Sequence, residues 1–228
     1  MATSLLRTRS VIAHSTSLKG VFCPAVTPFD DQLNPDIALF VEHCHQLLEE
    51  GCHGLAVFGT TGEANSLSVG ERMQLLDALV ESGIDGSMIT PGTGCTALTD
   101  SVRLTQHAVK LGCNGVLMLP PFYYKDVSND GLFRSFAEVI ERVGDHRLKI
   151  YLYHIPPVSG VPLDLSLVNR LADAYPDCVV GLKDSSGDWA YTESLLKMRP
   201  KFGTFSGSEV FLRQNLLAGG RGTITASA

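Results

Sequence analysis

The chain has 228 residues, of which 44% are hydrophobic and 18% charged, and its formal net charge is −6. That length suits a single α/β barrel domain of about 200–250 residues and argues against two independent cores. Because no run of about 18 apolar residues is present, and because Lys and Arg are scattered, membrane spanning and nucleic-acid binding are both disfavoured.

The N-terminal 18 residues contain no acidic side chain and are rich in Ser, Thr and Arg. A mitochondrial transit peptide has this composition, but so does a floppy tail, which we favour. We therefore predict a flexible tail over 1–18 and one catalytic domain over 19–228. The six cysteines lie at wide spacings without any C-x-x-C pair, which is typical of reduced thiols in a cytoplasmic protein.

From Gly20 onward the chain repeats a short β-rich apolar run, a loop rich in Gly, Pro and Thr, and a helical segment with one apolar face. This alternation is typical of βα units. Eight strands are predicted, at residues 21–26, 55–58, 87–90, 115–119, 149–153, 179–182, 203–205 and 222–225.

Three of the helices between these strands have clear signals. Asn34 followed by Pro35 predicts the start of the first helix, and Gly51 predicts its end. Ser68 with Glu71 forms a capping box for the second. An apolar stripe predicts the fourth, with Leu132, Phe133, Phe136, Val139, Ile140 and Val143 on one face.

Apolar strands interleaved with amphipathic helices predict a parallel sheet covered by helices. Eight such units favour closure into a (β/α)8 barrel, the TIM barrel, over an open doubly wound sheet. The sequence stops at Ala228, directly after the eighth predicted strand. We therefore expect a barrel truncated after strand eight, without its eighth helix and the helices beyond it.

Lys183 is the most informative residue at a predicted strand end, which is where barrels carry their chemistry. An ammonium group in the barrel mouth loses hydration, so it needs an ion pair or a depressed pKa. Asp184 is the candidate partner for an ion pair. A depressed pKa would instead make Lys183 a nucleophile that captures a ketone as a Schiff base, and the residue alone leaves both readings open.

Two further strand ends carry polar groups. Tyr153 lies where a proline ends the fifth strand, and its phenol can move protons or simply pack. The turn 59–63 supplies the hydroxyls of Thr60 and Thr61 together with backbone N–H groups. Such a turn suits a small carboxylate, although an ordinary polar turn would look the same.

Taken together, these motifs resemble the dihydrodipicolinate synthase and N-acetylneuraminate lyase superfamily of class I aldolases. The resemblance runs from Gly20 to Ala228. Its most specific marks are Gly59-Thr60-Thr61-Gly62-Glu63, Tyr153-x-Ile-Pro156 and Gly181-Leu-Lys183-Asp-Ser-Ser, in the order that the family has them.

The resemblance implies a role for each matching residue. Lys183 would form an imine with pyruvate, Tyr153 would shuttle protons, and Thr60 would link Tyr153 to Tyr123, which in the family crosses a subunit interface. The pyruvate would be held by Thr61, Ile224 and Gly59. The family also implies a homodimer or homotetramer.

No cofactor is expected, because the protonated imine itself serves as the electron sink. We also expect no metal. One group of potential ligands does not converge, because residues two apart on a helix face different directions: His43, Cys44, His45, Cys52 and His53.

Two positions depart from the synthase branch of the family. Val158 stands where that branch has the arginine of Y-N-x-P-x-R-T-G, and His154 replaces the asparagine. We therefore predict a lyase that reversibly cleaves a 2-keto-3-deoxy acid to pyruvate and an aldehyde. Alternatives are a 4-hydroxy-tetrahydrodipicolinate synthase using aspartate semialdehyde, a hydratase or dehydratase, and a truncated, inactive keto-acid-binding pseudoenzyme.

Overall fold

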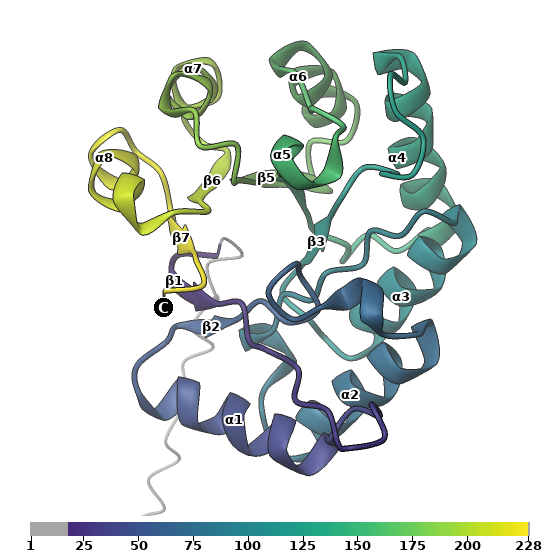
Figure 1. The fold of residues 1–228 in the computed structure, drawn as a ribbon. Coiled ribbons are helices and arrows are strands. Elements are labelled where there is room, and N and C mark those ends of the chain that lie inside the picture. The colour runs from purple at the N-terminus through teal and green to yellow at the C-terminus, as the bar shows by residue number, and fades with distance from the viewer. Residues whose placement is uncertain (1–17, 228) are drawn as a thin grey trace, which may run out of the picture.

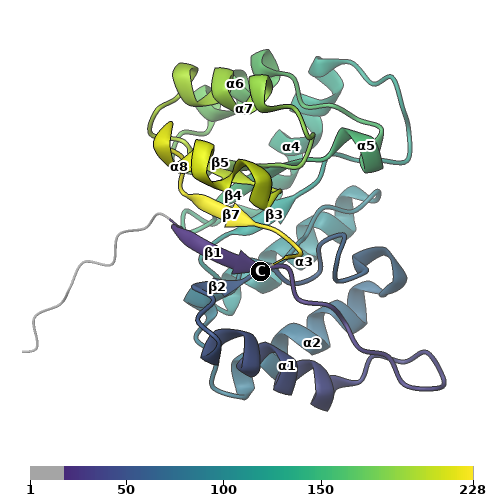
Figure 2. The same ribbon diagram turned by 60° about the vertical axis from the view of Figure 1, so that its left-hand side comes forward.

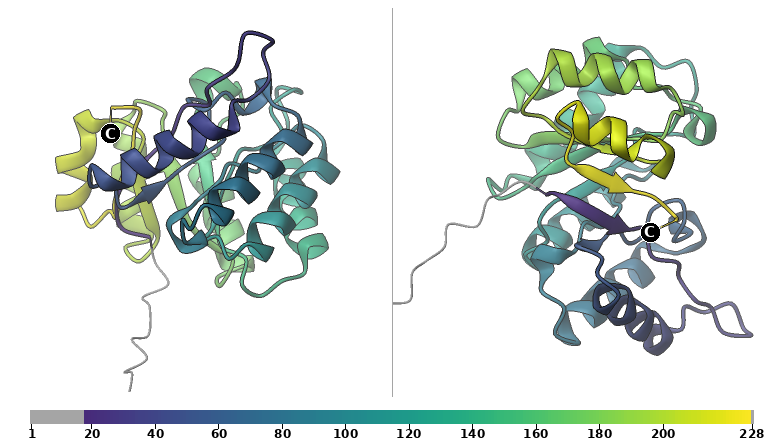
Figure 3. Two further views of the ribbon diagram at one scale, coloured as in Figure 1. Left: turned by 90° about the horizontal axis from the view of Figure 1, so that it is seen from below. Right: turned by 90° about the vertical axis from the view of Figure 1, so that its left-hand side faces the viewer.

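The structure, a computed structural model, describes residues 18–227, and Figure 1 shows helices around the outside of a curled sheet. The sheet is parallel and its strands are β1 (Gly20–Cys23), β2 (Gly54–Leu55), β3 (Val116–Met118), β4 (Ile150–His154), β5 (Val179–Asp184), β6 (Gly203–Ser206) and β7 (Gly222–Ile224). Their order is β2-β1-β7-β6-β5-β4-β3, so the first strand pairs with the last, as Figures 2 and 3 show. The predicted parallel α/β fold is confirmed.

The helices are α1 (Ile37–Glu49), α2 (Val69–Glu81), α3 (Leu98–Lys110), α4 (Asn129–Val143), α5 (Pro156–Ser159), α6 (Leu165–Ala174), α7 (Trp189–Met198) and α8 (Leu212–Leu217). Short 3-10 helices lie at Ala64–Ser66, Gly86–Met88 and Glu209–Phe211. Among the described helices, none has the length and apolar character needed to cross a membrane.

The predicted strand at 87–90 is wrong at its start. Its first residues lie in the 3-10 helix Gly86–Met88, where the Asp85 side chain accepts from the Ser87 N–H. The chain becomes extended only from Ile89, and residues 89–93 hydrogen-bond on one side to the β2 segment and on the other to β3. This segment therefore joins the two edge strands of the sheet.

The predicted start of the first helix is also two residues early. Asp36, not Asn34, is the N-cap, and its carboxylate accepts the Leu39 N–H at 3.0 Å. Pro35 instead forms a bridge with Phe29 before the helix begins. The capping box of α2 and the buried stripe of α4 are confirmed.

A small cluster of buried side chains fills the inside of the curled sheet: Leu18, Phe22, Ala56, Leu117, Tyr151, Phe205 and Ile224. The Tyr151 and Phe205 rings meet edge to face at 5.8 Å. Leu18, the last residue of the predicted tail, is buried here, whereas residues 1–17 lie outside the described part. Side chains alternate along a strand, so Tyr153 faces the same interior as Tyr151, two residues nearer the carboxyl end.

Asn215 of α8 forms hydrogen bonds with both β6 and β7, and its replacement tests how much these bonds stabilise the fold. The buried Nδ2 donates to the carbonyl oxygens of Thr204 (3.2 Å) and Gly222 (2.9 Å). Asn215→Ala removes both hydrogen bonds, although the Thr204 carbonyl keeps the Arg221 N–H as a donor. We therefore expect a loss of about 1–3 kcal/mol in the free energy of unfolding in urea. Gln46→Ala, which removes an exposed contact with Glu50, is the control. Equal losses in the two variants would contradict the assignment.

Candidate active site

Adjacent strands bring Lys183 and Tyr153 together inside the carboxyl end of the sheet. Tyr153 of β4 and Lys183 of β5 are direct partners in the parallel ladder. The Lys183 ammonium donates to the Tyr153 hydroxyl at 3.3 Å and lies 4.4 Å from the centre of its ring. Both side chains are buried. An amine and a phenol are therefore held at hydrogen-bonding distance from each other.

Burial lowers the pKa of Lys183, and the charge and hydroxyl of Tyr153 oppose that shift. Asp184 is not its partner, because its carboxylate accepts from the Ser186 N–H at 2.9 Å and from the Thr192 hydroxyl. Within residues 18–227, no carboxylate forms an ion pair with Lys183. The ammonium form is thus disfavoured by desolvation without an anion to restore it.

Thr60 brings the turn after β2 to the same group, since its Oγ1 lies 3.2 Å from the Tyr153 hydroxyl. The turn has an unusual backbone, with Phe58 and Glu63 both in the left-handed region at φ of 56° and 51°. Gly92 packs so closely beneath it that a Cβ would collide with the Phe58 carbonyl. Strained backbone of this kind persists only where the surroundings hold it, and it is common at functional sites.

A cavity of about 170 Å³ opens beside Tyr153. Its walls come from the ends of several strands, and they include Phe58, Gly59, Thr60, Leu117, Leu119, Phe122, Tyr153, Ile155, Val158 and Ser159. Glu63 is the one charged residue among all those that line it. The cavity is therefore mostly apolar, with hydroxyl groups at the end where Thr60 meets Tyr153.

The remaining predicted site residues are placed differently. Tyr123 is 73% exposed and stacks edge to face on Tyr124, so within one chain it does not reach Thr60. Thr61 is half-buried next to Thr60, and Ile224 is fully buried at the end of β7. The structure thus links Lys183, Tyr153 and Thr60 by hydrogen bonds and places Gly59 in the cavity wall. The contacts predicted for Gly59, Tyr123, Thr61 and Ile224 stay predictions.

The sequence did not single out the apolar walls. Phe58, Leu117 and Leu119 are ordinary strand residues by pattern, and only their position at the carboxyl ends of strands could have marked them. As for metals, the described residues hold no group of three or more His, Cys, Asp or Glu side chains that could bind an ion.

The chain is similar in sequence to proteins of one known family. The family model described as the dihydrodipicolinate synthetase family matches residues 17–228. A protein of Chloroflexus aurantiacus named an uncharacterized DapA-like lyase is 36% identical over 210 residues, which cover 91% of this chain and 69% of that one.

Solved structures agree on the fold. A crystal structure of dihydrodipicolinate synthase from Agrobacterium tumefaciens superposes with a TM-score of 0.87 at 36% identity, over 90% of this chain and 72% of the other. A variant of 2-keto-3-deoxygluconate aldolase from Sulfolobus solfataricus gives a TM-score of 0.81 at 25% identity, over 91% and 67%. Relatives with different named substrates thus share one architecture.

Proposed function

The chain belongs to the dihydrodipicolinate synthetase family and is a lyase of that family, and from this we propose that it binds pyruvate as a Schiff base on Lys183. The observation that supports the proposal most directly is the buried amine 3.3 Å from the Tyr153 hydroxyl, without a carboxylate partner among the described residues. At neutral pH an exposed lysine is almost wholly protonated and is a poor nucleophile. A lowered pKa makes more of the free amine available.

The mechanism follows from these groups. The Lys183 lone pair attacks the keto carbon of pyruvate, and the oxygen that becomes the carbinolamine hydroxyl takes up a proton. That hydroxyl leaves as water once it is protonated, and the nitrogen forms a protonated imine. Tyr153 lies at hydrogen-bonding distance from the amine and supplies and removes these protons, while Thr60 orients its hydroxyl.

Carbon–carbon chemistry then proceeds through the enamine. Loss of a proton from the pyruvate methyl group places an electron pair on that carbon, which attacks the carbonyl carbon of an aldehyde, and the aldehyde oxygen is protonated. Hydrolysis of the imine releases the 2-keto acid and restores the Lys183 amine. Cleavage is the reverse sequence, in which the imine accepts the electrons of the breaking bond.

The cavity walls favour a neutral aldehyde. No Lys or Arg is among the residues that line the cavity, and Val158 presents an apolar side chain there. A carboxylate such as that of aspartate semialdehyde would lose hydration without gaining an opposite charge. Hydroxyl groups of a sugar-derived aldehyde would instead find the polar side chains of Thr60, Glu63 and Ser66. We therefore favour aldol cleavage of a 2-keto-3-deoxy acid over the synthase reaction.

Two structural proposals accompany this function. The segment 89–93 takes the place of the third strand, so that the sheet is the closed (β/α)8 barrel of the family. The exposed Tyr123 lies in a subunit interface of a homodimer or homotetramer, where burial of its ring would remove apolar surface from water.

Incubation with pyruvate and borohydride, followed by intact mass measurement, tests the Schiff base. We expect one reduced pyruvate adduct per chain. In the condensation direction, we expect faster turnover with glyceraldehyde and N-acetylmannosamine than with aspartate semialdehyde. Faster use of aspartate semialdehyde would identify the synthase instead. An adduct without turnover of any aldehyde would indicate a pyruvate-binding pseudoenzyme.

A further inference from the structure

His154 lies next to Tyr153 on β4, but its side chain faces the helices rather than the cavity. The imidazole is 4% exposed and stacks on the ring of Tyr191 of α7, with centroids 4.2 Å apart and planes 8° from parallel. Its Nδ1 accepts the backbone N–H of Leu163 at 3.1 Å. Because Nδ1 accepts, a neutral ring carries its proton on Nε2.

Tyr191 binds the carbonyl group of the same residue, Leu163. Its hydroxyl donates to the carbonyl oxygen of Leu163 at 2.6 Å. The N–H and C=O of one buried residue are therefore both held by side chains, and these two side chains are stacked on each other. We refer to His154, Tyr191 and the backbone of Leu163 as the Leu163 clasp.

The clasp closes the end of a loop that forms one wall of the cavity. Between β4 and α6, Ile155, Val158 and Ser159 line the cavity. The middle of this loop is tied separately, because the Lys125 ammonium donates to the carbonyl oxygen of Ser159 at 2.7 Å. The start of the loop is tied by β4 itself. Leu163 is a further point at which the wall is fixed.

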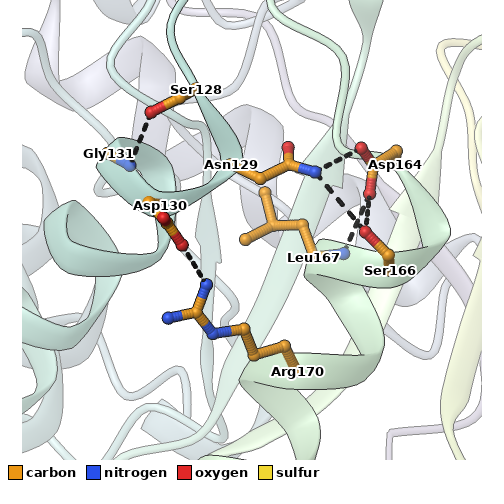
Figure 4. A network of polar contacts seen from close by, with 8 residues as sticks. All are labelled: Ser128, Asn129, Asp130, Gly131, Asp164, Ser166, Leu167 and Arg170. Atoms are coloured by element: carbon orange, nitrogen blue, oxygen red, sulfur yellow. Dashed lines mark hydrogen bonds and ion pairs between the residues drawn. The ribbon is translucent and has the colours of Figure 1, made fainter.

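Immediately after Leu163, the chain is anchored to the helix layer, as Figure 4 shows. Asp164 caps α6 by accepting the Leu167 N–H at 2.9 Å, and it also accepts from the side chains of Ser166 and Asn129. Asn129 belongs to α4, so this network joins two helices. This network fixes the start of α6. The Leu163 clasp then fixes the end of the preceding loop relative to that helix.

We infer that His154 and Tyr191 are positioning residues that hold the loop between β4 and α6 against the cavity and so set the affinity for the aldehyde. The inference rests on the proposed function, because the cavity is taken as the aldehyde site. Neither side chain lines the cavity, so both act through the Leu163 backbone. Pyruvate capture depends on Lys183, so it should not change when the Leu163 clasp is altered.

Three variants separate the contacts of the clasp. Tyr191→Phe removes the hydroxyl and keeps the ring, His154→Leu removes the acceptor, and His154→Asn keeps an acceptor at the position of Nδ1. With saturating pyruvate and glyceraldehyde as the probe, we expect the first two variants to raise KM for glyceraldehyde roughly 3- to 10-fold, as loss of a buried hydrogen bond does. His154→Asn should recover most of this loss.

The readouts distinguish positioning from general damage. Borohydride trapping of pyruvate should match the wild-type protein in every variant. Tyr175→Phe, which removes a hydroxyl that contacts Glu141 on the outer helices, is the matched control and should leave KM unchanged. Hydrogen exchange at the Leu163 amide should be faster in Tyr191→Phe than in this control.

Different outcomes overturn different statements. A wild-type chain that traps no pyruvate refutes the proposed function. If pyruvate is trapped but Tyr191→Phe leaves both KM for glyceraldehyde and Leu163 exchange unchanged, only the clasp is refuted. A fall in kcat at constant KM also refutes it, because the residues would then act on the Lys183 chemistry. If His154→Leu does not fold, the Tyr191→Phe result decides.

Discussion

Lys183→Ala is expected to abolish the borohydride-dependent pyruvate adduct and to lower aldol turnover by roughly 10⁴-fold or more, as removal of a covalent nucleophile does in other enzymes. The physical reason is that, among the described residues, Lys183 is the one buried lysine. Lys183 is buried with its amine against Tyr153, and burial lowers its pKa. Intact mass and initial rates of condensation measure the two effects.

The matched control is Lys201→Ala, because Lys201 is an exposed lysine outside the site cavity. It should keep both the adduct and the rate. Thermal unfolding of both variants checks that the fold survives. An adduct of unchanged yield in Lys183→Ala would show that pyruvate reacts with another amine and would remove the basis of the proposed mechanism.

Tyr153→Phe is expected to lower turnover by about 10²–10³-fold while it leaves the adduct detectable at longer times. The phenyl ring preserves packing, but the proton donor and acceptor between Lys183 and Thr60 is lost. General acid–base groups contribute about 10²–10⁴-fold, so a loss in that range identifies a proton-transfer role. Single-turnover trapping against full turnover separates imine formation from later steps.

The pH dependence of pyruvate trapping in Tyr153→Phe tests the role of Tyr153, because the direction in which the midpoint should shift can be predicted. Burial lowers the pKa of Lys183 and Tyr153 opposes this shift, so removal of the hydroxyl leaves desolvation less opposed. The free amine should then persist to lower pH, and the midpoint of the trapping rate should move down. A midpoint that moves up, or a variant with wild-type turnover, would contradict the role of Tyr153.

Much of the site was accessible from the sequence because strand ends are local features. Lys183 and Tyr153 each end an apolar run, and a parallel sheet brings the carboxyl ends of neighbouring strands to one edge. The turn 59–63 is likewise a local motif, and the structure places its Thr60 on Tyr153. The pairing of β4 with β5 joins the first two motifs, and the contact between Thr60 and Tyr153 adds the third.

The errors arose where competing local signals had similar strength. Asn34 and Asp36 are both good N-caps, and only the bridge from Pro35 to Phe29 shows that the chain has not yet turned into the helix. At 87–90, Asp85 caps a 3-10 turn that delays the extended segment to Ile89. The start of the helix and the start of the extended segment can therefore be located only once the surrounding backbone contacts are known.

By itself, the sequence determined the family and the alternation of strands and helices, and it supplied the candidate residues for the chemistry, because each of these depends on residue type and short spacing. Tertiary structure alone decided that Asp184 turns away from Lys183, that the cavity is lined without a cationic side chain, and that His154 meets Tyr191. These facts depend on which elements pack together over long separations in the chain, and residue spacing carries no information about such contacts.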